Sequence, residues 1–460
     1  MTASEGQTLN QIAMSVTDLR RTHQWYIDVF GFATGGGTEM FKGWATEKVQ
    51  GVPGAATTCW WLIDQQDYFQ LELFQFHRPA ARPLPTDWTP ADIGYSTIGI
   101  HVRDFDATLA RAAAFGTDPL SMPLGAPGER RVCLRDPEGV LIEILEQDIR
   151  AARIRARPRP ELPSVVRFVT ASVPDLARSR AFFVDGLGLE VAEDLSLHEP
   201  SHEALWGLEG AERRNLVLWA NDMLVELVEY TNPRGRPWPP NYYISDQGLL
   251  NIAFGYRSRS ELKKALRAAE AAGARPNWRV LDLLNWGVVY VNDEQGFSVE
   301  LLYVRPYWDR PMGFLPAAPD IAIERSLRID APAARVWERL VDHEQMSQWW
   351  PSRSTRLLQS GENRNGPGAV REVVGPTGTL VEEVVAWEPG ARLDYRLRSG
   401  APIRNHFGRV RLQETGETQC QLDYSIRFTP KIPLTGWVLK RLIAGMLGRG
   451  LRKLKALSER

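Results

Sequence analysis

The sequence repeats itself, and this repeat constrains the fold more than any other feature. Residues 11–16 (QIAMSV) alternate apolar and polar as a half-buried strand does, and a helical pattern follows that ends at Gly31. The same strand and helix pattern returns at residues 168–188. A second strand and helix pattern at residues 97–116 returns at residues 251–273. Each pattern therefore recurs after about 155 residues, which indicates a duplicated block of two similar modules.

Every module closes with an alternating strand that contains one glutamate. The four glutamates are Glu72, Glu143, Glu226 and Glu300. Burying an unpaired carboxylate is costly, so we expect each of these residues to have a partner. Nearby arginines such as Arg130 or Arg131 are one kind of partner, and a bound cation is another.

From about residue 320 the pattern changes. A strand is followed by a short amphipathic helix at residues 331–342, by several strand-like segments, and by a long helical stretch after Pro433. This order predicts an α+β fold in which a curved sheet wraps the terminal helix. Pro-rich segments at residues 150–163 and 305–319 separate the parts of the chain. The predicted domains are residues 1–149, 164–305 and 320–460.

Composition excludes several classes of function. Lys and Arg number 55 against 56 Asp and Glu, so the chain lacks the basic excess of a nucleic-acid binder. Its three cysteines are too few and too far apart for a disulfide framework or a four-thiolate zinc site. No phosphate-binding or dinucleotide-binding motif is present, so no nucleotide cofactor is indicated. We expect a cytoplasmic protein, because we find no secretory signal and no apolar stretch that could span a membrane. The patterns indicate no oligomeric state.

The repeated modules resemble the glyoxalase/bleomycin-resistance/dioxygenase family, which is the vicinal-oxygen-chelate superfamily. The resemblance is carried by the helix openings SVTDL, HVRDF and SVPDL, by the DPEG turn at residues 136–139, and by the glutamate-containing closing strands. It implies two tandem domains, each built from two βαβββ modules. Residues 320–460 resemble the START-like polyketide cyclase/dehydrase family, which has a helix-grip fold. This second resemblance is carried by IDAPAARVWERLVD, by Trp349-Trp350-Pro351, by VVAWEPGARLDYRL and by the terminal helix.

The first resemblance implies a metal site. In metal-using relatives, two modules close into a cup, and the ligands come from the first residue of each opening strand and from each closing glutamate. Carried over, the first domain offers Gln11, Glu72, Thr97 and Glu143, and the second offers Phe168, Glu226, Asn251 and Glu300. Gln11, Glu72 and Glu143 suit a divalent ion such as Mg, Mn, Ni or Fe. Because Phe168 cannot ligate, we expect the second domain to be a degenerate copy that shapes a pocket or an interface.

Three further positions bear on the expected site. The family usually has histidine where this chain has Thr97, and His101 is a candidate ligand or base four residues further on, displaced by roughly 13 Å along the strand. Glu72 or Glu143 is the candidate general base and acid. His198 and His202 have a zinc-like spacing, but they flank Pro200 in a predicted loop, so we expect them to be solvated.

The last domain is predicted to bind an apolar ligand between its sheet and its terminal helix. The candidate lining residues are Trp337, Trp349, Trp350, Trp387, Tyr395 and Tyr424. Ordinary core packing is the alternative for several of them. Residues 431–460 carry eight Lys or Arg and one acid, which a membrane-surface helix would also show, but we expect the solvated outer face of a grip helix.

These features favour a small-molecule enzyme. It would perform proton transfer (isomerisation, cyclisation, dehydration or lyase-type cleavage) on an oxygenated aromatic or polyketide-like substrate. The alternative is a non-catalytic carrier or resistance protein that sequesters a flat apolar ligand. A ring-cleaving extradiol dioxygenase is disfavoured, because that activity requires two histidines and one glutamate around iron, whereas the corresponding residues here are Phe168, Asn251 and Glu300.

Overall fold

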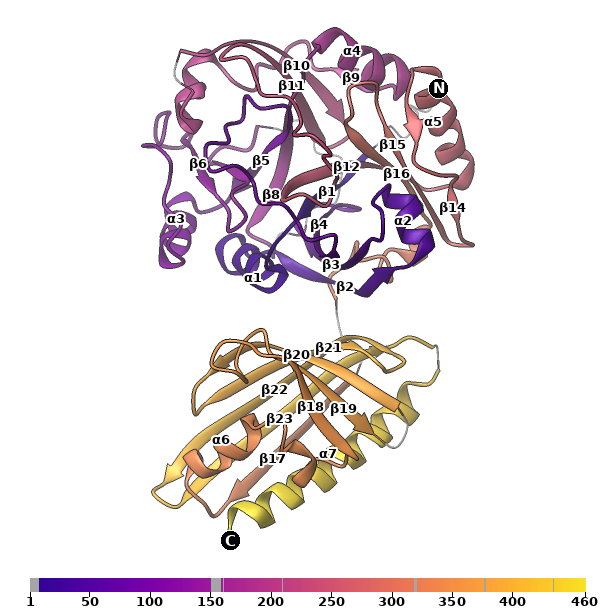
Figure 1. Cartoon of the computed structure of the whole chain (residues 1–460). Coiled ribbons are helices and arrows are strands. Elements are labelled where there is room, and N and C mark those ends of the chain that lie inside the picture. The colour runs from indigo at the N-terminus through magenta and orange to yellow at the C-terminus, as the bar shows by residue number, and fades with distance from the viewer. Residues whose placement is uncertain are drawn as a thin grey trace. The chain divides into compact units, whose positions relative to one another are not determined.

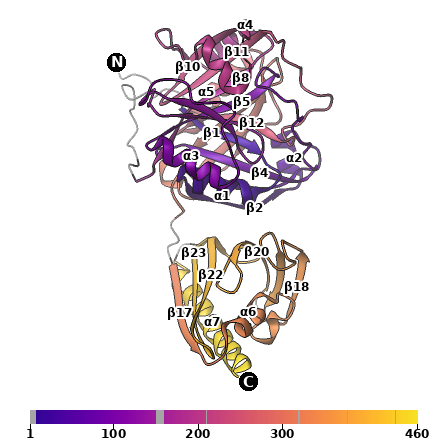
Figure 2. The ribbon, with the colours of Figure 1, turned by 90° about the vertical axis from the view of Figure 1, so that its left-hand side faces the viewer.

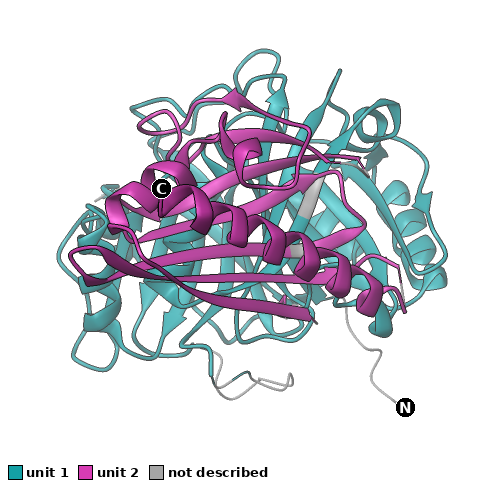
Figure 3. Ribbon diagram, turned by 90° about the horizontal axis from the view of Figure 1, so that it is seen from below, with its two compact units in different colours: residues 1–316 teal, residues 317–460 magenta. Residues whose placement is uncertain are grey.

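A computed structural model describes residues 8–149, 159, 161–208, 210–317, 321–375, 378–432 and 434–460. The chain divides into unit 1 (Met1–Pro316) and unit 2 (Ala317–Arg460), which Figure 3 colours separately. Unit 1 holds the four modules predicted from the repeat, and unit 2 holds the last predicted domain.

The four modules have clear bounds. The first comprises β1 (Thr8–Ser15), α1 (Leu19–Phe30), β2 (Ala33–Lys42), α2 (Trp44–Gln50), β3 (Ala56–Ile63) and β4 (Gln70–Arg78). The second comprises β5 (Gly94–Val102), α3 (Phe105–Ala114), β6 (Arg131–Arg135) and β7 (Leu141–Leu145). The third comprises β8 (Ser164–Ser172), α4 (Leu176–Arg180), η1 (Ala181–Gly186), β9 (Glu190–Val191), η2 (Pro200–Trp206), β10 (Glu212–Ala220) and β11 (Met223–Asn232). The fourth comprises β12 (Gly248–Tyr256), α5 (Arg259–Ala271), β13 (Arg275–Pro276), β14 (Leu281–Asp282), β15 (Trp286–Asn292) and β16 (Ser298–Val304), and η3 (Pro306–Trp308) follows.

Local sequence explains how these elements begin. Asp18 precedes α1, and its side chain accepts a hydrogen bond from the backbone N–H of Arg21, which satisfies one of the free donors of the first turn. Asp104 and Asp175 cap α3 and α4 in the same way. The recurrent strand-then-Asp openings are therefore helix caps, and α1 ends before Gly31 as the pattern predicts.

Unit 1 contains two sheets. The first has the order β13-β15-β16-β12-β1-β4-β3-β2, and β14 pairs with β15. The second has the order β6-β7-β5-β8-β11-β10-β9. At their centres, β1 lies antiparallel to β12 and β5 lies antiparallel to β8, which can be followed in Figure 1. The first module therefore pairs with the fourth, and the second pairs with the third.

This pairing corrects the expected division into domains at 1–149 and 164–305, which joined neighbouring modules. The first connector (residues 79–93) leads the chain from β4 in one sheet to β5 in the other, and the second connector (residues 233–247) leads it back from β11 to β12. All four modules share one strand and helix pattern, so the pattern alone cannot select which modules pair.

Unit 2 has the predicted architecture of a curved sheet and a long terminal helix. Its elements are β17 (Ile321–Ile329), α6 (Ala333–Val341), η4 (Met346–Gln348), β18 (Ser354–Gln359), β19 (Val370–Gly375), β20 (Gly378–Glu388), β21 (Arg392–Ser399), β22 (Ile403–Gly416), β23 (Gln419–Pro430) and α7 (Gly436–Ser458). The sheet order is β17-β23-β22-β21-β20-β19-β18. Figures 2 and 3 show α7 lying along one face of this sheet, where it buries Leu447, Leu451 and Leu454. Within the described residues, no helix is both long and apolar enough to cross a membrane.

Candidate functional site

Four oxygen-bearing side chains face one side of the first sheet, at a place that we call the first cup. They are Gln11 on β1, Glu72 on β4, Asn251 on β12 and Glu300 on β16. Ala13 on β1 lies opposite Asn251 and beside Glu72, and Ala253 on β12 lies opposite Gln11 and beside Glu300. Because residues two apart on a strand share a face, all four side chains point to the same side of the sheet.

The two glutamates of the first cup are buried without a basic partner. The Trp61 indole N–H donates to Glu72 Oε1 at 2.7 Å, and the Cys59 thiol lies 3.9 Å from the same oxygen. Tyr290 hydrogen-bonds Glu300. No ion pair from Lys, Arg or His reaches either carboxylate within the described part of the chain. Burial therefore raises the pKa of Glu72 to about 7, and burial together with the Glu72 charge raises the pKa of Glu300 well above its usual range.

The amide groups of the first cup are also short of partners. Gln11 Nε2 donates to the Gln70 side-chain oxygen at 2.7 Å, which leaves the buried Gln11 Oε1 with no donor. Asn251 is fully buried, and its side chain interacts with the Tyr290 hydroxyl, but neither of its amide atoms completes a hydrogen bond of normal geometry. Buried polar atoms are almost always satisfied, so unsatisfied ones at a single place point to a missing partner.

The oxygen atoms of these four side chains suit a hard divalent ion. Two carboxylates and two amide oxygens make an oxygen set of the kind that Mg²⁺ or Mn²⁺ accepts, and their charge would be neutralised by one such ion. Within the residues that the structure describes, no three His, Cys, Asp or Glu side chains form a metal-binding group. An ion in the first cup would therefore be held by Gln11, Glu72, Asn251 and Glu300 together.

A short segment covers the first cup, and we call residues 312–314 the strap. The Gln70 amide donates to the carbonyl oxygens of Gly313 at 3.0 Å and Met312 at 3.3 Å. A Cβ at Gly313 would lie 2.4 Å from the Trp61 ring, and the backbone φ there is +79°, so only glycine fits this approach. Phe314 is fully buried against Tyr68, with ring centroids 4.6 Å apart.

The second sheet carries a second cup with the same geometry and different chemistry. Its equivalent residues are Thr97 on β5, Glu143 on β7, Phe168 on β8 and Glu226 on β11. Here the His198 ring lies between the two glutamates. Its Nε2 donates to Glu143 Oε2 at 2.9 Å, and its Nδ1 donates to Glu226 Oε2 at 2.6 Å. The Phe168 ring packs edge-on against the same imidazole, with centroids 5.2 Å apart.

Two arginines flank the second cup, and one of them, Arg213, also pairs with the buried Glu203. Arg131 lies 3.2 Å from Glu143 Oε1, and Arg213 lies 3.6 Å from Glu226 Oε1. Burial opposes ionisation of all three central groups, but their mutual attraction outweighs it. The pKa of His198 is raised to about 9, that of Glu226 is lowered to about 2, and that of Glu143 is also lowered. The imidazolium thus takes the place between the carboxylates, and a metal ion does not fit this cup.

The predicted metal site is therefore corrected. The structure brings Gln11 and Glu72 together but places Glu143 in the other sheet, where its partners are His198 and Arg131. Glu300 and Asn251 stand where Glu143 and Thr97 were expected. One signal was present in the sequence: only the first and fourth modules together supply four carboxylate or amide side chains.

The histidine expectations also change. His198 is buried, whereas we expected it to be solvated, because the loop before η2 folds over the second cup. His101, the candidate base, lies near the end of β5 beside Leu145 of β7 and Val165 of β8. Burial lowers the pKa of His101, whereas the nearby negative charge of Asp148 acts to raise it. The structure places it in the second sheet, apart from Glu72.

In unit 2, the six predicted ligand-binding residues belong to one apolar cluster. Trp349, Trp350, Tyr395 and Tyr424 are buried, and Trp337 and Trp387 are partly buried. The hydroxyls of Tyr395 and Tyr424 lie 2.8 Å apart, and the rings of Trp337 and Trp387 lie 5.8 Å apart. Their role in binding stays a prediction.

Unit 2 also contains a buried polar network that the sequence analysis missed. Arg371 donates to Glu382 at 2.8 Å, lies 3.2 Å from His343 Nδ1, and stacks over the Tyr395 ring at 4.9 Å. Burial and the Arg371 charge lower the pKa of His343 to about 3, so this imidazole is neutral. Alternating positions on β19 and β20 carry these charges, and the strand pattern alone does not show that they face the interior.

Comparisons with known proteins agree with both parts of the architecture. Residues 8–144 match the family model of the Glyoxalase/Bleomycin resistance protein/Dioxygenase superfamily, and residues 320–459 match the model described as polyketide cyclase/dehydrase and lipid transport. The structure is similar to glyoxalase I from Zea mays, at 17% identity over 68% of this chain and 97% of that chain, with a TM-score of 0.45. It is also similar to a START superfamily protein from Mycobacterium smegmatis, at 16% identity over 30% of this chain and 97% of that chain, with a TM-score of 0.28. Comparison with curated protein sequences finds no match.

Proposed function

Since the chain joins a member of the glyoxalase superfamily, at residues 8–144, to a polyketide cyclase/dehydrase domain, at residues 320–459, we propose that it is a small-molecule enzyme whose proton-transfer site is the first cup. The reaction class is isomerisation, cyclisation, dehydration or lyase-type cleavage. The substrate class is an oxygenated aromatic or polyketide-like compound that presents two neighbouring oxygens.

One observation carries the proposal. Glu72 and Glu300 are buried without a basic partner in the described residues, and the Gln11 amide oxygen, which has no donor, and the Asn251 amide face the same side of the sheet. A structural role would favour paired charges, as in the second cup. A cluster of oxygens that lacks its counter-charge favours a site that receives a cation and a substrate.

The residues of the first cup have separable roles. A bound divalent ion would supply stabilisation of the negative charge that develops on the substrate oxygens. Gln70 orients the Gln11 amide through its 2.7 Å hydrogen bond. Trp61 holds Glu72 in place, and the Glu300 carboxylate removes and returns the substrate proton beside the Tyr290 hydroxyl.

Unit 2 is proposed to bind a small hydrophobic ligand or the apolar part of the substrate. The description of its family includes lipid transport, and its interior combines aromatic walls with a few polar groups, as ligand sites commonly do. The paired hydroxyls of Tyr395 and Tyr424 and the Arg371 guanidinium are the polar groups proposed to orient the ligand.

The proposal is tested with three versions of the full chain: the native protein, Glu300→Gln, and Glu226→Gln as the matched control in the second cup. Metal content is measured after dialysis against Mn²⁺, and deuterium uptake from D₂O is followed by NMR for a panel of aromatic α-hydroxyketones. We expect one bound ion and deuterium uptake in the native protein and in Glu226→Gln, and neither in Glu300→Gln. If the protein instead binds the ligand without a bound ion, and if Glu300→Gln binds it equally well, the protein is a carrier and not an enzyme.

A further inference from the structure

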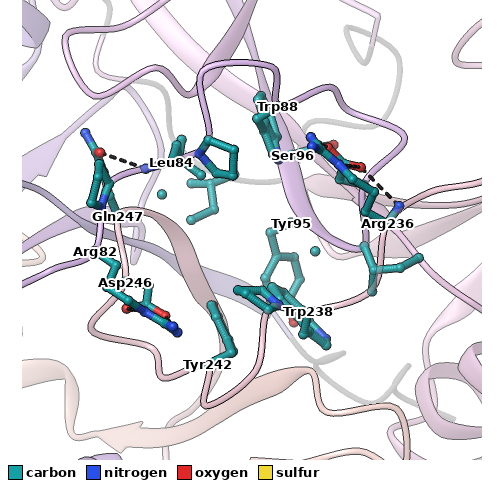
Figure 4. Close-up of a pocket in the computed structure, with 18 of the residues that line it drawn as sticks. Arg82, Leu84, Trp88, Tyr95, Ser96, Arg236, Trp238, Tyr242, Asp246 and Gln247 are labelled. Atoms are coloured by element: carbon teal, nitrogen blue, oxygen red, sulfur yellow. Dashed lines mark hydrogen bonds and ion pairs between the residues drawn. The ribbon is translucent and has the colours of Figure 1, made fainter.

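The two connectors of unit 1 enclose a pocket that is separate from both cups. It has a volume of about 300 Å³ and is lined by residues 82–96 of the first connector and β5, by residues 236–249 of the second connector and β12, and by Val140. None of the four residues of the first cup lines it. Figure 4 shows this connector pocket with its aromatic side chains and the ion pairs on either side.

Aromatic side chains form much of its wall. Trp88, Tyr95, Trp238 and Tyr242 all line the pocket. Trp238 and Tyr242 stack on each other, with centroids 4.2 Å apart. Behind them, Phe297 packs edge-on against Tyr95 at 5.3 Å and against Trp238 at 5.6 Å. These contacts fix the rings, so they are in place before anything binds.

A glycine makes room for this wall. Gly94 has a backbone φ of +146°, and a Cβ there would lie 2.8 Å from the Trp238 ring. Any other residue would push the indole out of the pocket wall or strain the backbone. The start of β5 is thus adapted to the indole of the second connector.

The pocket is flanked on two sides by reciprocal ion pairs between the connectors. Arg82 of the first connector binds Asp246 of the second through two hydrogen bonds of 2.9 and 2.5 Å. Arg236 of the second connector binds Asp92 of the first through two hydrogen bonds of 2.9 and 2.6 Å. The two pairs occupy equivalent positions in the repeat, so the connectors clasp each other symmetrically.

Prolines stiffen the backbone between these ion pairs. They are Pro83, Pro85, Pro237 and Pro239. Proline fixes φ, so these segments lose little further freedom when a ligand binds. The remaining walls are aliphatic, with Leu84, Ile93 and Leu249 among them. The pocket is therefore rigid and largely apolar, whereas protein interiors normally fill such spaces with their own side chains.

The charge arrangement defines the class of ligand. Each guanidinium is already bound bidentately by its own carboxylate, and Arg236 also pairs with Asp87 at 2.8 Å, so no cationic group of the described lining is left free to bind a ligand anion. The Gln247 amide is also occupied, since its oxygen accepts from the backbone N–H of Leu84 at 3.0 Å and its nitrogen donates to Glu138 at 2.8 Å. The buried Trp238 indole N–H has no partner among the described residues, so an uncharged ligand oxygen could accept a hydrogen bond from it. A charged ligand would lose its hydration without gaining an unpaired opposite charge.

From this arrangement we propose that the connector pocket is a binding site for a flat, uncharged aromatic compound of about two rings. Its volume lies at the small end of ligand pockets, which sets the size of the compound. Stacked and edge-on aromatic contacts favour a planar ring system. This site does not depend on the proposed function, because it shares no residue with the first cup.

The test uses 2-naphthol as the probe and the full chain labelled with 5-fluorotryptophan. The ¹⁹F resonances of Trp88 and Trp238 are assigned from Trp88→Phe and Trp238→Phe. We expect both resonances to move with saturable dependence on 2-naphthol, with a dissociation constant below about 1 mM. No shift, or shifts confined to tryptophans outside the pocket, would overturn the proposal.

Two further arms sharpen the result. Leu84→Trp fills the pocket and is expected to weaken binding at least tenfold, whereas Leu284→Trp adds the same side chain at an exposed site of unit 1 and leaves binding unchanged. If Leu84→Trp fails to fold by circular dichroism, Trp238→Leu takes its place, with the same expected loss. Naphthalene-2-carboxylate and 2-naphthylmethylammonium are expected to bind at least tenfold more weakly than 2-naphthol. Tighter binding of either ion would refute an uncharged ligand.

Discussion

The two cups of unit 1 have the same backbone and opposite electrostatics. In the second cup, Glu143 and Glu226 are bridged by the His198 imidazolium and flanked by arginines, and the pKa of each carboxyl falls below its usual value. In the first cup, Glu72 and Glu300 have no such partner among the described residues, and both pKa values rise. The same pair of strand positions therefore carries an ion cluster in the second sheet. In the first sheet it carries two glutamates that have no opposite charge beside them in the described part of the chain and hold their protons more tightly.

The two cups show how one scaffold keeps a stabilising ion cluster in one sheet and a candidate functional site in the other. A buried charge is tolerated when the chain places an opposite charge beside it, and it destabilises the fold otherwise. His198 supplies that opposite charge from within the chain. The first cup keeps two buried carboxyl groups without an opposite charge in the residues that the structure describes, and the strap over it shields them from water. Substitutions and changes of pH act differently on the two cups.

The largest effect is expected from His198→Ala. It leaves two buried carboxylates around an empty space, and breaking a buried ion pair costs roughly 3–5 kcal/mol of unfolding free energy. Chemical denaturation of the full chain measures this loss for unit 1. His202→Ala is the matched control in the same loop. It removes a capping contact to the Glu199 backbone and an edge-on ring contact to His198, leaves the His198 ion pairs in place, and should cost about 1 kcal/mol. Equal losses for both variants would contradict the central role of His198.

The next effect concerns ion affinity in the first cup. Glu72→Gln and Glu300→Gln each remove a charged oxygen donor and should weaken Mn²⁺ binding by about 100-fold or more, because losing a residue that only orients a ligand already costs roughly 10- to 100-fold. Isothermal titration calorimetry measures the affinity. Glu143→Gln, in the second cup, should leave it unchanged. A comparable loss of Mn²⁺ affinity in Glu143→Gln would mean that Glu143 is an ion ligand and that the first cup is not the ion site.

Alkaline pH is expected to destabilise unit 1 through the second cup. The folded pKa of His198 is about 9, against 6.5 for a free imidazole, so its stabilisation is complete below pH 6.5 and is lost as the pH rises through 9. The full loss is about 3 kcal/mol, at 1.36 kcal/mol per unit of pKa. Denaturation midpoints from pH 6 to 10 measure it. In His198→Ala the same pH range should produce no such decline, and a persistent decline would assign the effect to another group.

The smallest effect is the pH dependence of ion binding to the native protein. Glu72, with a pKa of about 7, is mostly protonated at pH 6 and mostly ionised at pH 8. Because a divalent ion needs the ionised carboxylate, Mn²⁺ affinity should rise at least about tenfold between these pH values. Titration calorimetry at both pH values checks this. An affinity that is flat across this range would mean that the ion binds elsewhere.

Much of the fold could be predicted from the sequence. The strand, Asp cap and helix pattern set the elements of each module, as α1 shows from Asp18 to Phe30, and the alternating segments after residue 370 match β19 to β23. These features are local, because they depend on the period of apolar residues and on caps. The fusion of the two families is likewise confirmed by the matches at residues 8–144 and 320–459.

The candidate site was less predictable, because it depends on contacts between distant segments. Gln11 and Glu72 belong to one module, so the closing-strand pattern placed both on one face. Their partners Asn251 and Glu300 come from the other end of unit 1, and the strand pattern, which all four modules share, does not show which modules pair. His198 lies in a loop without periodicity, so no local signal showed that it would be buried.

The nested pairing of modules has a consequence for synthesis on the ribosome. The second sheet is built from residues between 94 and 232, so its strands are all available well before translation of unit 1 ends. The first sheet needs β1 at the start and β12 and β16 near the end, and β1 waits with an unpaired edge in the meantime. Exposed strand edges promote aggregation. The half of unit 1 that carries the candidate chemistry is therefore the last to be completed during synthesis and the one that exposes an unpaired strand edge for longest.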